Sequence, residues 1–107
     1  MEFSIVKIET YIPEEYINKL REELNSIGAL TIDGIYDNCM SYSKVRGSWR
    51  PLEGANPFNG EIGVLCEGEE MKVEFCCTTG VYKEATETIR KVHPYETPVI
   101  NVLPIID

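Results

Sequence analysis

The chain has 107 residues, enough for one hydrophobic core and too few for two independent ones. Hydrophobic residues make up 43% and charged residues 26%, and no stretch approaches the roughly 20 apolar residues that cross a bilayer. We therefore expect one globular domain, residues 1–107, with no membrane partner. The net charge of −8 repels a phosphate backbone and argues against DNA or RNA as a partner.

The N-terminus and the cysteines favour a reducing compartment. The first seven residues contain no basic segment followed by an apolar run, so we expect a cytoplasmic protein. Cys39, Cys66, Cys76 and Cys77 show no CxxC spacing, and the adjacent pair should point to opposite faces of a strand. We interpret the cysteines as reduced, space-filling thiols. Soft ligands for copper or zinc are the alternative for Cys39, Cys76 and Cys77.

The first half of the chain predicts a strand, a helix and a second strand. Residues 3–11 are rich in β-branched and aromatic types, which is typical of a strand. Pro13 then begins a helix whose apolar residues recur at steps of three or four. Gly28 suits a left-handed cap at the end of this helix. A second strand is expected over about residues 34–43.

Residues 44–63 predict a long loop. Glycine and proline are too frequent there for a helix or a central strand. Loops of this length inside compact domains are either functional or disordered, and disordered segments avoid large apolar side chains such as Trp49, Leu52 and Phe58. We expect an ordered, functional loop.

The second half predicts a strand, a helix and a last strand. Residues 71–77 alternate between apolar and polar types, except at Cys76, as in a half-buried strand. A helix follows over about residues 80–92, with Thr78 or Thr79 as its cap. Residues 98–105 indicate a strand with prolines near its ends.

The order βαββαβ predicts an α+β, ferredoxin-like sandwich. It consists of a four-stranded antiparallel sheet with both helices on one face. The other face would be bare, and outward-facing residues such as Ile5, Cys39 or Cys76 would lie on it. We expect copies of the chain to cover that face, giving a homo-oligomer with a trimer favoured.

Three segments carry a family resemblance. They are Gly34-Ile-Tyr-Asp-Asn-Cys39, the run Gly47-Ser-Trp-Arg-Pro-Leu-Glu-Gly-Ala-Asn-Pro-Phe-Asn-Gly-Glu-Ile-Gly63, and His93-Pro-Tyr-Glu-Thr-Pro98. Together they resemble the PII/CutA-like insert domain of the NGG-interacting-factor family. The last segment also resembles one near the C-terminus of CutA-type divalent-cation-tolerance proteins, and this implies trimers of ferredoxin-like domains.

The resemblance also shapes the expectation about catalysis. Full-length members of the NGG-interacting-factor family carry the insert between two halves of a larger domain with a two-metal, hydrolase-like centre. This sequence shows neither half, and its one histidine is too few for a two-metal site. We therefore expect no hydrolase activity and assign no catalytic residue.

A basic cluster in the long loop is the first candidate site. Lys44, Arg46 and Arg50 flank Trp49, so arginine forks could bind a phosphate or carboxylate while the indole stacks on a base. The alternative is that these side chains only pair with carboxylates of the same chain or of a neighbouring subunit. The resemblance to PII proteins supports nucleotide binding, although the loop lacks a Gly-x-x-x-x-Gly-Lys-Ser/Thr motif.

A second candidate site centres on the histidine. His93, Glu96, Glu53 and Asp37 would meet if the last helix end, the loop and the second strand lie at one sheet edge, and they could then bind a divalent metal or transfer a proton. The alternative is that His93 caps the helix or bonds a neighbouring carboxylate.

These sites define the expected function. The candidate ligand-binding residues are Trp49, Arg50, Glu53, Asn56, Arg46, Lys44, Asp37 and Tyr95, and the candidate metal ligands are His93 and Glu96. We expect a non-catalytic binding and assembly module that contacts a small ligand or a partner protein. The alternatives are a CutA-type protein that binds a divalent metal ion, and an enzyme that acts on a small anion with Glu53 or His93 as base.

Overall fold

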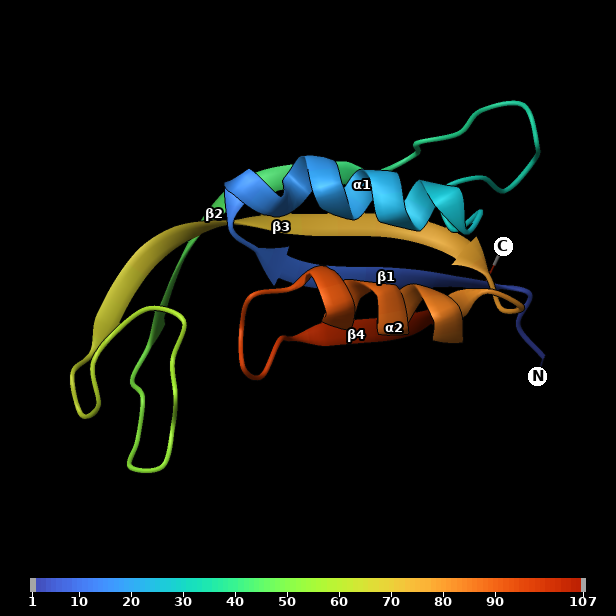
Figure 1. The fold of residues 1–107 in the computed structure, drawn as a ribbon. Coiled ribbons are helices and arrows are strands. Elements are labelled where there is room, and N and C mark those ends of the chain that lie inside the picture. Colours follow the sequence, from blue (N-terminus) through green and yellow to red (C-terminus); the bar gives the residue numbers. More distant parts are fainter. Residues whose placement is uncertain (1, 107) are drawn as a thin grey trace.

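Four antiparallel strands and two helices make up the computed structural model, which describes residues 2–106 (Figure 1). The elements are β1 (Ile5–Ile12), a 3-10 turn η1 (Glu14–Tyr16), α1 (Ile17–Ser26), β2 (Ser41–Trp49), β3 (Cys66–Thr78), α2 (Tyr82–Val92) and β4 (Ile100–Ile105). The strand order is β2-β3-β1-β4, with every pair antiparallel. Both helices cover one face of the sheet, which confirms the predicted ferredoxin-like arrangement.

The core lies between the sheet and the helices because the central strands bury every second residue. The fully buried large side chains include Ile8, Ile12, Leu20, Leu24 and Ile89. Each such side chain contributes about 1.5–3 kcal/mol through removal of apolar surface from water. Residues predicted to form the helical stripes therefore drive the packing of α1 and α2 onto β1 and β3.

The helix ends follow the sequence signals in part. Gly28 has φ +79°, and the amides of Gly28 and Ala29 donate to the carbonyls of Asn25 and Leu24, so a left-handed cap closes α1 as predicted. The predicted cap of α2 is wrong. Val81 occupies the cap position and no side chain caps the helix, because Thr78 is still the last residue of β3.

The second strand lies further along the chain than predicted. The expected strand over residues 34–43 is instead β2 (Ser41–Trp49), and residues 36–40 form no regular structure. Gly47 is tolerated within β2 because it lies opposite Gly68 on an edge strand, where Trp49 packs against Gly68. The connection between β2 and β3 is therefore residues 50–65 rather than 44–63.

The far ends of β2 and β3 form an arm, residues 45–70. Here Cys66–Glu70 pair only with β2, since the ladder between β1 and β3 ends at Met71. The arm projects beyond the helices (Figure 1). The radius of gyration of 15.0 Å accordingly exceeds the value of about 13 Å expected for a compact chain of this length.

No helix within residues 2–106 combines the length and the apolar composition needed to traverse a bilayer.

Candidate functional site

The segment after α2, residues 93–98, forms a corner that the arm contacts. His93 is buried at the end of α2, and its backbone amide donates to the Ile89 carbonyl at 2.8 Å. Its ring joins the corner to β1: Nε2 lies 2.6 Å from the Tyr11 carbonyl oxygen, and within the corner Nδ1 accepts from the Tyr95 amide at 3.2 Å. This pattern needs a neutral ring with its proton on Nε2. Burial accordingly lowers the pKa of His93 below its usual value of 6.5.

Tyr95 connects the corner to the base of the arm. Its hydroxyl donates to Glu70 Oε2 at 2.9 Å, and its ring lies 4.6 Å, centroid to centroid, from the ring of His93. Burial, together with the Glu70 carboxylate, raises the pKa of Tyr95 above its usual value of 10. The tyrosine therefore stays protonated and donates its hydrogen bond throughout the physiological range.

The loop of the arm packs back onto the corner through Phe58 and Asn56. The Phe58 ring lies 6.4 Å from the ring of Tyr16 in an edge-on geometry and 5.9 Å from that of Tyr95. The Asn56 amide donates to Glu96 Oε2 at 3.0 Å. Residues 50–65 are thus held against the body of the molecule.

The base of the loop is fixed by Trp49. The indole N–H donates to the Asn59 carbonyl at 3.0 Å. Gly60 has φ +110°, and a Cβ added there would lie 2.9 Å from Cys66 Sγ and 3.0 Å from Trp49 Nε1. Trp49 therefore holds the loop internally, an arrangement that competes with the predicted role of stacking on a base.

The basic residues of the first candidate site are spread over two elements. Lys44 and Arg46 belong to β2 and not to the loop, and they form exposed ion pairs: Lys44 with Glu14 and Glu69 at 3.9 and 3.8 Å, and Arg46 with Glu67 at 3.6 Å. Surface pairs of this kind contribute little stability.

Two further candidates lie in the loop itself. Arg50 and Glu53 are exposed there, and neither forms a side-chain hydrogen bond or ion pair with residues 2–106. The guanidinium of Arg50 therefore remains accessible to an anion.

The acidic residues of the second candidate site do not converge on the histidine. Asp37 lies in the connection between α1 and β2, at the end of the molecule away from the arm (Figure 1). Its carboxylate accepts from Asn25 and Asn38, and these hydrogen bonds, led by that from Asn25, lower the pKa of Asp37. The expected meeting of Asp37 with His93 is wrong because β2 begins seven residues later than predicted and leaves Asp37 in a loop.

A metal centre receives no geometric support among residues 2–106. They contain no group of three or more histidine, cysteine, aspartate or glutamate side chains placed to hold an ion. Both nitrogens of His93 are occupied, and Glu96 accepts a bond from Asn56. Binding through His93 would require these hydrogen bonds to break.

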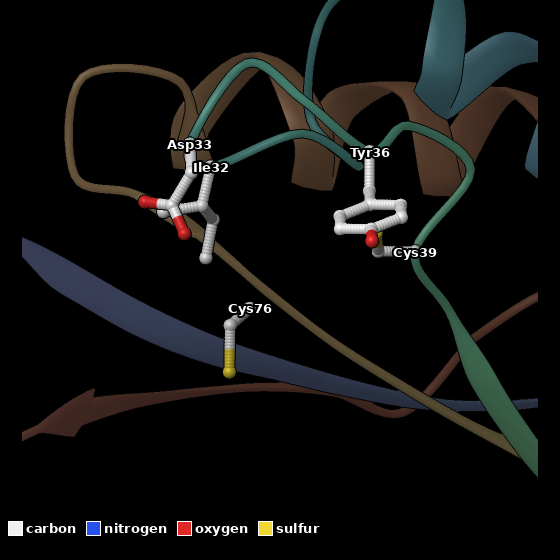
Figure 2. Close-up of a pocket in the computed structure, with 5 residues that line it drawn as sticks. All are labelled: Ile32, Asp33, Tyr36, Cys39 and Cys76. Carbon is white, nitrogen blue, oxygen red and sulfur yellow. The ribbon is translucent and has the colours of Figure 1, made fainter.

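Two overlapping hollows lie at the end of the sheet away from the arm. The smaller, of about 240 Å³, is lined by Ile32, Asp33, Tyr36, Cys39 and Cys76 (Figure 2). The larger, of about 500 Å³, shares Cys39 and Cys76 and extends to Lys7 and Glu74. Cys39 and Cys76 thus line one continuous depression, whereas Cys77, the third of the cysteines considered as soft metal ligands, is buried and does not line it.

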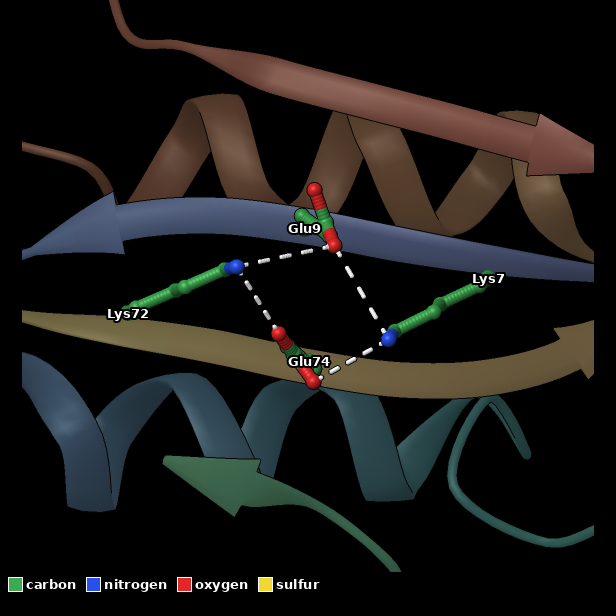
Figure 3. A network of polar contacts seen from close by, with 4 residues as sticks. All are labelled: Lys7, Glu9, Lys72 and Glu74. Carbon is green, nitrogen blue, oxygen red and sulfur yellow. Dashed lines mark ion pairs between the residues drawn. The ribbon is translucent and has the colours of Figure 1, made fainter. Parts of the chain in front are cut away.

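The centre of the open sheet face is charged. Lys7, Glu9, Lys72 and Glu74 form a ring with alternating signs, whose ion pairs measure 3.1–3.8 Å (Figure 3). Hydrogen bonds from Lys72 and then Lys7 lower the pKa of Glu74, and the bond to Glu74 raises that of Lys72. The face expected to be bare is therefore polar at its centre, although half-buried Ile5 and Cys76 alternate onto it as predicted.

Sequence reasoning missed two partners of the corner. Glu70 and Tyr16 contact Tyr95 and Phe58, but this pairing depends on the register of β3 and on the turn before α1. Glu70 also lies just before the alternating residues 71–77 from which the strand was predicted, so no sequence signal singled it out.

Comparison with known proteins agrees with this architecture. Residues 59–107 match the family described as CutA1 divalent ion tolerance protein. A protein of Staphylococcus aureus (strain Mu50 / ATCC 700699), named GTP cyclohydrolase 1 type 2 homolog, is 34% identical over 99 residues, which is 92% of this chain and 27% of that protein. The chain spans about a quarter of the length of the curated relatives it matches.

Solved structures show the same fold. A Bacillus cereus protein related to NIF3 superposes with a TM-score of 0.82 at 25% identity, over 98% of this chain and 26% of that one. CutA1 from Shewanella sp. SIB1 superposes with a TM-score of 0.74 at 17% identity, over 100% of this chain and 86% of that one. The chain therefore has the ferredoxin-like α+β fold of CutA proteins.

Proposed function

We propose that the chain is a non-catalytic binding and assembly module, equivalent to the insert domain of the NGG-interacting-factor family. The superposition of nearly the whole chain on a quarter of a NIF3-related protein supports this equivalence. The register supports it as well. Ile5 lies opposite Ile105, so β1 begins where β4 ends, the geometry that a domain inserted into another chain requires.

The observation that carries the proposal is the docking of the arm on the corner. Phe58 and Asn56 contact the corner, and Trp49 bonds to Asn59 within residues 50–65. The same loop exposes Leu52, Ile62 and, on the approach to β3, Leu65, with 68%, 49% and 60% of their surface accessible. An ordered loop that displays apolar side chains beside a free arginine is suited to recognise a partner protein or a small anionic ligand.

Self-association is the assembly part of the proposal, with a trimer favoured. On the open face, the two lysines and two glutamates of the ring have no net charge. Ile5 and Leu103 of β4 border this ring, and Leu103 is 40% exposed. A second copy would cover this face without burying an unpaired charge. Sedimentation equilibrium on the purified chain tests this. We expect a mass of three chains, and a mass of one chain at every concentration contradicts assembly.

Ligand binding is tested by calorimetric titration with ATP and GTP. We expect heat of binding that Arg50→Ala removes and that Arg90→Ala, an exposed basic change on α2, leaves unchanged. Equal loss in both variants would indicate only a general charge effect. If the native chain gives no heat of binding, nucleotides are excluded as the ligand and a partner protein becomes the favoured ligand.

The second candidate function is binding of a divalent metal ion, favoured by the match of residues 59–107 to a divalent ion tolerance family. It requires His93 and Glu96 to exchange their hydrogen bonds for the ion. Titration with Cu²⁺ and Zn²⁺ separates the candidates. Binding that Glu96→Gln and His93→Ala both abolish supports the metal site, and binding that survives both excludes it.

The absence of catalysis is tested on the activity suggested by the relatives' name. We expect no turnover of GTP by the purified chain without an added partner. Turnover that Glu53→Gln abolishes would instead support the enzyme hypothesis.

A further inference from the structure

The ladder between β2 and β3 stops before β3 does. β2 begins with Ser41 opposite Glu74, whereas β3 continues to Thr78. On this side the last four residues of β3 have no strand partner, although β1 pairs with them on the other side. The depression that contains the two thiols occupies the place where β2 would continue.

The register places Cys39 opposite Cys76. Ser43 faces Lys72 and Ser41 faces Glu74, so two more residues of the same antiparallel ladder bring position 39 against position 76. Alternation sends Cys76 to the open face, because Phe75 and Cys77 are buried on the other side. Side chains at directly opposite positions have Cβ atoms about 4.5–5.5 Å apart, close to the reach of a disulfide.

In the present conformation the two thiols are free and lie on separate walls of the depression (Figure 2). The Cys39 amide donates to the Leu30 carbonyl at 3.1 Å, and its thiol contacts the Asp37 carbonyl at 3.6 Å. These contacts hold residue 39 away from the edge of β3. Leu30 is buried in the core, whereas residues 32–39 of the connection between α1 and β2 are exposed and are the part that would have to move.

The remaining cysteines, Cys66 and Cys77, are poorly placed to form a disulfide with either of these two. Cys77 is buried on the helix side, and burial, followed by the effect of Cys76, raises the pKa of its thiol to about 11. Cys66 lies in the arm, where its thiol contacts the Val64 carbonyl. Cys39 and Cys76 are therefore the pair that a small molecule in the depression can reach together.

We propose that Cys39 and Cys76 form a thiol–disulfide exchange site for a low-molecular-weight disulfide such as oxidised glutathione. The exposed thiolate of Cys39 attacks one sulfur of the disulfide, forming a mixed disulfide and releasing one glutathione thiol. The Cys76 thiolate then attacks Cys39 Sγ and displaces the second glutathione. The protein loses two electrons and two protons, and these reduce the disulfide to two thiols.

Closure would change the shape of this end of the molecule. Residues 39 and 40 would join the edge of β3 and lengthen β2, and the contact between Cys39 and Leu30 would be lost. The depression would narrow as its two walls are linked. This site lies at the opposite end of the sheet from the arm and does not depend on the proposed function (Figure 1).

The test exposes the full native chain to a series of ratios of reduced to oxidised glutathione. Free thiols are then trapped with a maleimide and the protein is examined by intact mass and non-reducing peptide mapping. We expect a product that has lost two hydrogens and contains one peptide pair linked through Cys39 and Cys76. A disulfide that closes the loop between residues 39 and 76 should raise the melting temperature by about 5 °C or more.

Two variants separate the steps. Cys76→Ser should stop at a single glutathione adduct on Cys39, because the resolving thiol is missing. Cys66→Ser is the matched control and should form the same internal disulfide as the native chain. Separate adducts on both cysteines of the native chain, a link through Cys66, or a link between two chains would overturn the proposal.

Discussion

His93 accepts from Tyr95 and donates to Tyr11 from a buried position at the end of α2. His93→Phe keeps a ring of similar size and removes both hydrogen bonds. We expect a loss of about 1–3 kcal/mol in the free energy of unfolding, because the Tyr11 carbonyl loses its partner in a buried setting. Urea denaturation at neutral pH measures this, with the exposed Lys91→Ala as control. A cost equal to that of the control would contradict the structural role of the ring.

The same histidine predicts a dependence of stability on pH. Its pKa is lowered in the folded state, mainly by burial, so below pH 6.5 the unfolded chain binds a proton that the folded chain resists. The contribution of neutral His93 is complete above pH 6.5 and falls as the pH drops from there toward the folded pKa. We expect the unfolding free energy of the native chain to decline between about pH 7 and pH 5.5, with a weaker decline in His93→Phe. If the unfolding free energies of the native chain and of His93→Phe fell in parallel with pH, His93 would be excluded as the cause of the decline.

Gly60 tests the role of Trp49. Gly60→Ala places a methyl group 2.9 Å from Cys66 Sγ in a backbone region with φ +110°. Gly54→Ala is matched, since φ there is +97° but no atom lies within 4 Å. We expect Gly60→Ala to destabilise by about 1–3 kcal/mol and to red-shift the Trp49 fluorescence, and Gly54→Ala to leave the fluorescence unchanged. Equal spectra in the two variants would show that the indole is not packed as described.

At the level of single residues, composition was a good guide to the loop and a poor one to its contacts. The large side chains among glycines and prolines predicted an ordered segment, and Trp49 and Phe58 do hold it. The partners could not be predicted, because Glu70 and Tyr95 are 25 residues apart in the sequence and meet only in the folded chain. Such pairs depend on tertiary register, which local pattern does not contain.

At the scale of elements, Phe58 joins the loop of the arm to the body of the molecule through two aromatic contacts. Phe58→Ala removes the packing on Tyr16 and Tyr95 and should release residues 50–65 while the core stays folded. We expect faster hydrogen exchange at the Asn56 amide and a stability cost near 1 kcal/mol, since aromatic pairs contribute about 0.5–1.5 kcal/mol. Leu52→Ala is the control, because that side chain is 68% exposed. Unchanged exchange in Phe58→Ala would show that the loop is ordered by other contacts.

The predicted boundaries of β2 were wrong because residues that are unusual in a strand have suitable partners on β3. Gly47 is typical of a strand breaker, yet it pairs with Gly68 in the ladder, Trp49 packs against Gly68 and the Glu70 carboxylate lies beside Gly47. Lys44 and Arg46 similarly looked like loop residues, but they meet Glu69 and Glu67 across the ladder. Central elements were predicted well because burial on one face dictates their period, whereas the arm obeys cross-strand pairing.

The shape and charge of the whole molecule decide how copies can meet. The open face is electrically balanced at its centre, while the chain as a whole carries −8. If copies of the chain meet through this face, the contact itself has no net charge, but the acidic surfaces around it approach one another and repel. Repulsion of this kind is long-ranged and is screened over about 10 Å at 0.1 M salt.

Assembly should consequently strengthen with salt. Small-angle scattering of a single chain should give a radius of gyration close to 15.0 Å, and an assembly should give a larger value and a multiple of the 12.2 kDa mass. We expect the scattering mass at fixed protein concentration to rise between low salt and about 0.3 M salt, because screening weakens the repulsion between acidic surfaces.

Lys72→Glu breaks the balance of the charged ring and should shift the scattering mass toward that of a single chain, whereas Lys19→Glu on the exposed side of α1 adds the same charge away from that face. If both variants dissociate equally, total charge and not the open face governs assembly, and the contact between copies lies elsewhere.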